Sequence, residues 1–235
     1  MIEATTGRPE ITPYSLHAVF YILNLHGIGT AKHEVLPSEA RVWISQEQFA
    51  AALDFTKGRT DVAWTFDDAN ESDYTVALPA LQSRGLKAQF FIVADRVDRP
   101  GYLSSHQIEE LIGAGMEIGS HGLRHRPWAE LANGELEEEL LLSRERLQEL
   151  ACQEIRNASC PYGSYNRRVI GALQRAGYKR VYTSDQGPAR PGSYLVPRNT
   201  IYRNWNGADL RTATSKPGTA SRLCRSLKLL LKRLR

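Results

Sequence analysis

The stretch Val62-Ala63-Trp64-Thr65-Phe66-Asp67-Asp68 decides how the rest of the sequence is interpreted. An apolar run that contains β-branched and aromatic residues is followed at once by two acidic residues, which predicts a buried strand that ends at a turn. Two adjacent carboxylates are costly to bury unless a positive charge lies beside them. The end of this strand therefore carries either a plain turn or a site that holds positive charge.

Five more apolar runs have the length of strands, and amphipathic stretches with helical spacing lie between most of them. The predicted strands cover residues 19–25, 62–66, 88–93, 116–119, 156–160 and 180–183, and the predicted helices cover 74–84, 105–114, 134–151 and 166–176. This alternation predicts an α/β fold, and the carboxyl ends of parallel barrel strands converge on one face. The residues expected to share that face are His26, Asp67, Asp68, His121 and the turn Pro161-Tyr162-Gly163.

Charge is distributed unevenly along the chain. No acidic residue follows Asp209, whereas eight basic residues do. The rest of the chain holds 22 of the 30 basic residues against all 26 acidic residues, which argues against a nucleic-acid partner. Three cysteines without paired spacing, and the lack of any apolar run near the ~20 residues that span a bilayer, predict a cytoplasmic location.

A metal site explains the acidic pair best. His121 and His125 are four residues apart, a spacing that puts two imidazoles on one side of a turn. With Asp68 they form a common set of ligands for catalytic zinc, and Asp67 would then accept a proton from the attacking water. Each part has a simpler explanation, since Asp pairs cap helices, His pairs lie on surfaces and Pro-Tyr-Gly forms turns. Their joint placement at strand ends favours the metal site.

Three motifs carry a family resemblance: Thr65-Phe66-Asp67-Asp68-Ala69, Ser120-His121-Gly122-Leu123-Arg124-His125 and Cys160-Pro161-Tyr162-Gly163-Ser164-Tyr165-Asn166. They resemble the first three motifs of the polysaccharide deacetylase family, also called the nodulation-factor deacetylase homology domain or carbohydrate esterase family 4. The similarity extends over roughly residues 15–200. It implies a deformed, TIM-like (β/α) barrel of about seven parallel strands that removes an acetyl group, usually from an N-acetylated hexosamine.

The resemblance also implies roles for individual residues. Asp67 matches the catalytic base, and the backbone N–H of Tyr162, between Pro161 and Gly163, matches the donor to the oxyanion. The residues that match the ligands of one divalent ion, zinc or alternatively cobalt, nickel or manganese, are Asp68, His121 and His125.

The chain departs from the family pattern at three places. Ala69 replaces a glycine, which we expect only to tighten the turn. Ser159 replaces an arginine that braces the catalytic Asp, and no histidine follows His125 to serve as the late general acid. We expect Arg198 to supply the missing cation, although an arginine after a loop proline also fits a surface position. We expect His26 to supply the missing acid, because Gly27-Ile28-Gly29 lets the backbone approach a ligand, although a histidine that only caps a strand is the alternative.

Three functions follow from these features. The first is removal of an N-acetyl group from an amino sugar of a polysaccharide or glycan precursor, in the biosynthesis of a surface polysaccharide such as lipopolysaccharide. The second is deacetylation or deformylation of a lipid-linked amino sugar. The third is a degenerate barrel that binds carbohydrate without turnover, which the missing arginine and histidine would explain.

The basic tail forms a second unit. We expect residues 1–212 to form the catalytic barrel and residues 213–235 to form an amphipathic tail, helical over 220–235. One face of that helix carries five leucines, namely Leu223, Leu227, Leu230, Leu231 and Leu234. Cations occupy the rest of its surface. Such a helix either lies in an anionic membrane surface, which would be the inner face of the membrane, or docks its leucines on the barrel.

Overall fold

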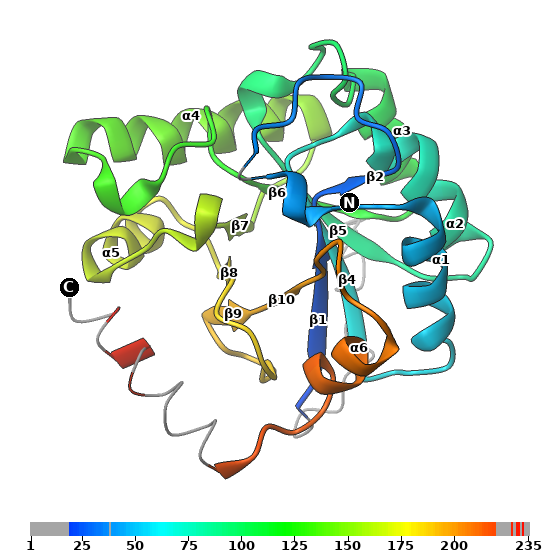
Figure 1. Cartoon of the computed structure of the whole chain (residues 1–235). Helices are drawn as coiled ribbons and strands as arrows, with labels where there is room; N and C mark the ends of the chain where they lie inside the picture. The colour runs from blue at the N-terminus through cyan, green and yellow to red at the C-terminus, as the bar shows by residue number, and fades with distance from the viewer. Residues whose placement is uncertain (1–18, 38, 220–226, 228, 231, 233–235) are drawn as a thin grey trace, which may run out of the picture.

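The computed structural model describes residues 19–37, 39–219, 227, 229, 230 and 232. Figure 1 shows a nearly closed barrel of parallel strands with helices around its outside. Neighbouring strands pair in the order β10-β1-β4-β5-β6-β7-β8-β9. Their bounds are β1 Tyr21–Leu25, β4 Val62–Asp67, β5 Ala88–Ile92, β6 Glu117–Ser120, β7 Asn157–Ser159, β8 Arg180–Thr183, β9 Leu195–Pro197 and β10 Asn199–Thr200.

One interrupted strand closes the barrel. β9 pairs with β8 and β10 pairs with β1, and only Arg198 separates β9 from β10. Counted as one, these two segments make seven parallel strands, which confirms the predicted deformed (β/α) barrel. The position of Arg198 at the interruption matters for the site, because its side chain enters the barrel there.

Helices connect the strands on the outer surface. They are α1 Gln46–Phe55, α2 Leu78–Gln82, α3 Ser105–Gly113, α4 Asn133–Ala151, α5 Arg167–Arg175 and α6 Gly207–Ala213. Short helical turns also occur at η1 Ala40–Val42, η2 Asp73–Ala77, η3 Ala94–Arg96, η4 Trp128–Glu130 and η5 Pro161–Gly163. A small parallel pair, β2 Gly27–Ile28 with β3 Trp43–Ile44, extends from the end of β1.

The predicted elements are present with small shifts, and several others were not predicted. The predicted helix over 74–84 begins as the π-helical turn η2 and continues as α2. The elements that the sequence interpretation missed are β2, β3, β9, β10, α1 and α6. None of the described helices is long and apolar enough to cross a membrane.

Two apolar layers hold the barrel together, and β4 contributes to both sides of the sheet. Trp64 and Phe66 point outward, where Phe66 stacks on Phe90 with ring centroids 4.7 Å apart. Thr65 and Asp67 alternate with them and therefore point inward. The inner apolar cluster is small, consisting of Ile22, Phe91, Tyr182, Ala189 and Val196. Polar side chains fill the barrel beyond this cluster, toward the carboxyl ends of the strands.

The predicted tail lies mostly outside the described residues. Leu223, Leu231 and Leu234 belong to that undescribed part. Residues 227, 229, 230 and 232 are described and helical. The boundary predicted at residue 212 falls in the last turn of α6.

Candidate active site

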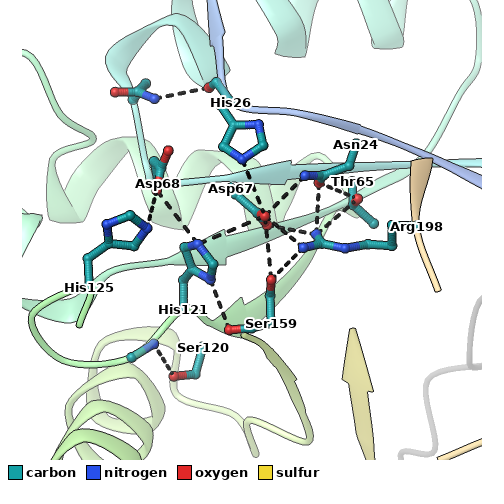
Figure 2. Close-up of polar contacts among 12 residues, drawn as sticks. Asn24, His26, Thr65, Asp67, Asp68, Ser120, His121, His125, Ser159 and Arg198 are labelled. Atoms are coloured by element: carbon teal, nitrogen blue, oxygen red, sulfur yellow. Dashed lines mark hydrogen bonds and ion pairs between the residues drawn. The ribbon is translucent and has the colours of Figure 1, made fainter. Parts of the chain in front are cut away.

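Asp67 and Arg198 form a buried ion pair inside the barrel. Arg198 Nη1 donates to Asp67 Oδ1 and Nη2 donates to Oδ2, each at 2.7 Å. The exposed fractions of Asp67 and Arg198 are 2% and 1%. Figure 2 shows the guanidinium facing the carboxylate edge on. Such a two-pronged pair fixes the orientation of the carboxylate as well as its charge.

Three neighbours complete the surroundings of this pair. Asn24 Nδ2 donates to Asp67 Oδ2 at 3.1 Å, and Asn24 Oδ1 accepts from Arg198 Nη1 at 2.8 Å. Thr65 Oγ1 donates to the same Asn24 oxygen at 2.7 Å. Ser159 Oγ accepts from Arg198 Nη2 at 2.5 Å. Burial is the largest single effect on the pKa of Asp67 and raises it. The charge of Arg198, the next largest effect, acts together with the Arg198 hydrogen bonds and with His121 and His26, and the sum lowers that pKa to about 2.

Asp68 leaves the strand in a left-handed turn. Its φ is 82° and that of Ala69 is 62°, a region that favours glycine. Ala69 is therefore strained, by roughly 1–2 kcal/mol, and the expectation that alanine only tightens this turn was wrong. The turn directs the Asp68 side chain away from Asp67 and toward the two histidines, as Figure 2 shows.

Asp68, His121 and His125 bring one potential ligand atom each within 4.8 Å of the others, and all three residues are buried. Asp68 Oδ1 is a buried atom without a hydrogen-bond partner of acceptable geometry. Histidine nitrogens nevertheless lie close to it, with His125 Nε2 at 3.1 Å and His121 Nε2 at 3.6 Å. A buried carboxylate oxygen next to two imidazole nitrogens fits a divalent metal ion.

The protonation of His121 also fits this role. Its Nδ1 donates to the Ser159 carbonyl at 2.9 Å, which leaves the Nε2 lone pair directed at the carboxylates. Burial lowers the pKa of His121 to about 4, so the imidazole is neutral near pH 7. A neutral imidazole with a free Nε2 is the form that binds metal.

Glu139 of α4 shapes the loop that carries both histidines. Its carboxylate accepts from the backbone N–H of Leu123 at 3.0 Å and from that of Arg124 at 3.1 Å. Gly122, with φ at 84°, leaves space for this contact, since a Cβ there would lie 2.8 Å from Glu139 Oε2. Glu139 is fully buried. The sequence interpretation missed this residue, because it is one of many Glu residues in an amphipathic helix.

Arg96 is a second cation at the site that the sequence interpretation missed. Its Nη1 lies 3.2 Å from Asp68 Oδ1, and its Nη2 lies 3.4 Å from His125 Nδ1. The guanidinium also lies 5.0 Å from the ring centroid of Tyr102. It therefore contacts the same carboxylate as the two histidines, from the side of η3.

His26 lies at the site, as its place at the end of β1 predicted. Its Nε2 is 4.0 Å from Asp67 Oδ2, and its Nδ1 is buried without a hydrogen-bond partner. The first glycine after it has a use other than the one expected. A Cβ on Gly27 would lie 2.2 Å from the Trp43 ring, so Gly27 allows close packing of that ring and not the approach of a ligand.

The turn Pro161-Tyr162-Gly163 borders the two histidines. Tyr162 has a φ of 55°, and its ring lies 4.5 Å from that of His125. Its side chain is 58% exposed. The turn thus lies beside the metal-ligand candidates, at the open side of the site.

The profile described as polysaccharide deacetylase matches residues 55–181, which is more than half of the chain. The chain belongs to the polysaccharide deacetylase family. The match includes the motifs of Asp67, Asp68, His121, His125 and the Pro-Tyr-Gly turn, whereas His26 and Arg198 lie outside it.

Two relatives agree with membership of this family, and a solved structure shares the fold. YxkH of Bacillus subtilis, assigned to the polysaccharide deacetylases, is 25% identical over 73% of this chain and 60% of its own length. Peptidoglycan-N-acetylglucosamine deacetylase of Bacillus cereus is 28% identical over 63% of this chain and 70% of its own length. The Streptococcus pyogenes deacetylase PplD, solved with acetate, superposes with a TM-score of 0.74 at 21% identity, over 85% of this chain and 99% of that one. The chain thus spans about 60% of the length of YxkH.

The structure explains how this member of the polysaccharide deacetylase family accommodates Ser159. The family pattern implies an arginine at this position, and here the small serine leaves room for the Arg198 guanidinium, which reaches Asp67 from β9–β10. Arg198 also lies over the rings of Phe91 and Tyr182, at 5.2 and 5.9 Å from their centroids. A cation is thus supplied to Asp67 from another part of the barrel.

Proposed function

We propose that this chain is a metal-dependent hydrolase that removes an N-acetyl group from an amino sugar of a polysaccharide or glycan precursor. The observation that supports it most strongly is that the two adjacent acidic residues, Asp67 and Asp68, have different partners. Asp67 is held ionised by Arg198, whereas Asp68 faces His121 and His125. A base and a metal-ligand set thus lie side by side in a member of the polysaccharide deacetylase family.

The proposed metal is zinc, with cobalt, nickel or manganese as alternatives. Asp68, His121 and His125 would hold it, and two imidazoles with one carboxylate are ligands that zinc uses in hydrolases. When bound, such an ion polarises the acetyl carbonyl and lowers the pKa of a water molecule from 15.7 toward roughly 7.

The remaining roles belong to residues of the chain. Asp67 is placed to accept a proton from the attacking water, and Arg198 keeps it ionised and oriented. The backbone N–H of Tyr162 is the proposed donor to the oxyanion, where one such donor contributes about 3 kcal/mol. His26 is the proposed acid for the leaving amine, because it has a buried ring nitrogen without a partner and lies beside Asp67.

The substrate class rests on the relatives. One of them is named for deacetylation of N-acetylglucosamine in peptidoglycan. We propose an N-acetylated amino sugar here, in the biosynthesis of a surface polysaccharide, with a lipid-linked amino sugar and a formyl group as alternatives. A barrel that binds carbohydrate without turnover is disfavoured, because the ion pair of Asp67 would have no function in it.

Acyl release from a panel of substrates tests the proposal. Protein loaded with zinc is incubated with N-acetylglucosamine oligosaccharides, peptidoglycan fragments and N-formylated analogues, and acetate and formate are measured separately. We expect acetate release that disappears on treatment with a chelator and returns when zinc is restored. Formate release alone would shift the function to the alternative, and no release from any substrate would favour the binding barrel.

A further inference from the structure

The described part of the tail presents leucines to solvent. Residues 227, 229, 230 and 232 are helical. Leu227 is 59% exposed and Leu230 is 53% exposed, whereas Leu229 is partly buried. In Figure 1 this segment lies at the periphery of the molecule. Leu227 and Leu230 are among the most exposed large apolar residues of the described part of the chain.

An ion pair holds this segment on the barrel. Lys232 Nζ lies 2.9 Å from Asp185 Oδ1 and 4.0 Å from the centroid of the Tyr165 ring. The same carboxylate accepts from Thr183 Oγ1 at 2.8 Å and from Tyr165 Oη at 2.5 Å. The side chain of Asp185 is only 7% exposed. Lys232 therefore points toward the barrel.

Helical geometry places the leucines on the opposite side. Each residue of an α-helix advances by about 100°, so Lys232 lies about 140° from Leu227 and about 200° from Leu230. The face that contacts Asp185 is thus nearly opposite the face of these two leucines. Leu227 and Leu230 therefore do not dock on the barrel. Docking of the tail leucines was one of the two arrangements predicted from the sequence.

Charge indicates which partner fits this face. Eight basic residues and no acidic residue follow Asp209. A second copy of the chain would bring two such tails together, with repulsion between their cations. A nucleic acid would match the charge but would leave the leucines exposed. An anionic lipid surface accommodates both, because leucines enter the acyl boundary while cations stay among the headgroups.

We propose that the leucine face of the tail, defined by Leu227 and Leu230, binds an anionic membrane leaflet while Lys232 links the tail to the barrel. The cytoplasmic leaflet carries the anionic lipids that such a segment requires. This surface is separate from the metal-ligand residues, so its failure would leave the proposed deacetylase function unaffected.

Sedimentation with vesicles tests the proposal. The full chain is mixed at low salt with vesicles of phosphatidylglycerol and phosphatidylcholine, or of phosphatidylcholine alone. The matched variants are Leu227→Ser with Leu230→Ser in the tail, and Leu36→Ser with Leu141→Ser as a control, since Leu36 and Leu141 are 51% and 49% exposed elsewhere. Thermal unfolding and light scattering establish that each variant is folded and give its oligomeric state.

We expect the wild type and the control pair to bind the anionic vesicles, with weaker binding at high salt. The tail pair should bind at least tenfold more weakly. The proposal is overturned if the wild type ignores anionic vesicles, or if the tail pair binds them as well as the control pair does. A dimer that dissociates in the tail pair, without vesicle binding, would assign the face to a second copy instead.

Discussion

Arg198 shows how far a single residue can be predicted from sequence. It lies 131 positions after Asp67, and no local pattern connects the two. The prediction depended on charge, since a buried carboxylate without its usual arginine requires another cation. The partners Asn24 and Ser159 could not be predicted in the same way, because neutral polar side chains produce no comparable imbalance. The contacts of Arg198 with Asp67 support its predicted role as the cation that orients this carboxylate, and activity measurements on variants test that role.

The first prediction is that an arginine at position 159 can replace Arg198 as the cation beside Asp67. Arg198→Ala leaves Asp67 buried without its cation, so kcat/KM should fall at least 100-fold. The pKa of Asp67 should rise from about 2, because burial then acts without its main counterweight. The acid limb of the kcat/KM profile should therefore move to higher pH. Adding Ser159→Arg to this variant should raise kcat/KM at least tenfold and return the acid limb to lower pH. The reason is that Ser159 Oγ lies 2.5 Å from Arg198 Nη2, so an arginine at position 159 can place its guanidinium near Asp67. A double variant no better than the single one would contradict the exchange.

Asp73 provides a prediction about stability. It is 1% exposed, and neither carboxylate oxygen has a hydrogen-bond partner. Burial, followed by the charges of Asp68 and Asp67, raises its pKa well above the ordinary value of 3.8. The folded protein thus holds a proton that the unfolded chain releases. Stability from this group is present below about pH 3.8 and is lost as pH rises toward the raised value.

Replacing Asp73 by Asn should therefore stabilise the fold. The free energy of unfolding should increase by more than about 1 kcal/mol at pH 7, and by less at pH 5. Urea unfolding followed by circular dichroism, with a chelator present, measures both values. Asp54→Asn is the control, since the Asp54 side chain is 65% exposed. A loss of stability in Asp73→Asn at pH 7 would show that this carboxylate is ionised and paired.

At the scale of elements, most long segments were predicted and most short ones were missed, with the ten-residue helix α1 and the three-residue strand β7 as exceptions. β4, β5 and α4 have enough residues to show their periodicity. β9 and β10 have three and two residues and carry the interruption at Arg198, so no periodicity develops. α1 did carry a usable signal, the capping box of Ser45 and Gln48. Contacts between elements, such as that of Glu139 with the histidine loop, depend on packing that a local pattern does not contain.

The contact between α4 and the histidine loop leads to the next prediction. Glu139→Gln replaces one of the two acceptor oxygens by an amide donor that faces backbone N–H groups. Zinc affinity should fall by about 10- to 100-fold, as for other residues that orient metal ligands. Isothermal titration calorimetry measures this change. Glu138→Gln is the matched control on the same helix, because Glu138 forms an ion pair with the Arg124 side chain and is 41% exposed. Equal affinities for the two variants would show that Glu139 has no part in the metal site.

At the scale of the whole molecule, the barrel brings together residues from both ends of the described chain. His26 follows β1, and Arg198 lies between β9 and β10, the two segments that close the barrel. The family profile covers the middle of the chain and includes neither residue. Closure of the barrel therefore has a chemical consequence, because it supplies the cation that pairs with Asp67.

The most direct measurement compares the two adjacent carboxylates. Zinc content by mass spectrometry and acetate release are determined for the wild type, Asp67→Asn and Asp68→Asn under the same conditions. The account predicts one zinc ion per chain in the wild type and in Asp67→Asn, with acetate released only by the wild type, whereas Asp68→Asn should lose the metal. Loss of zinc from Asp67→Asn, or acetate release by that variant at the rate of the wild type, would contradict the assignment of Asp67 as the base beside the metal.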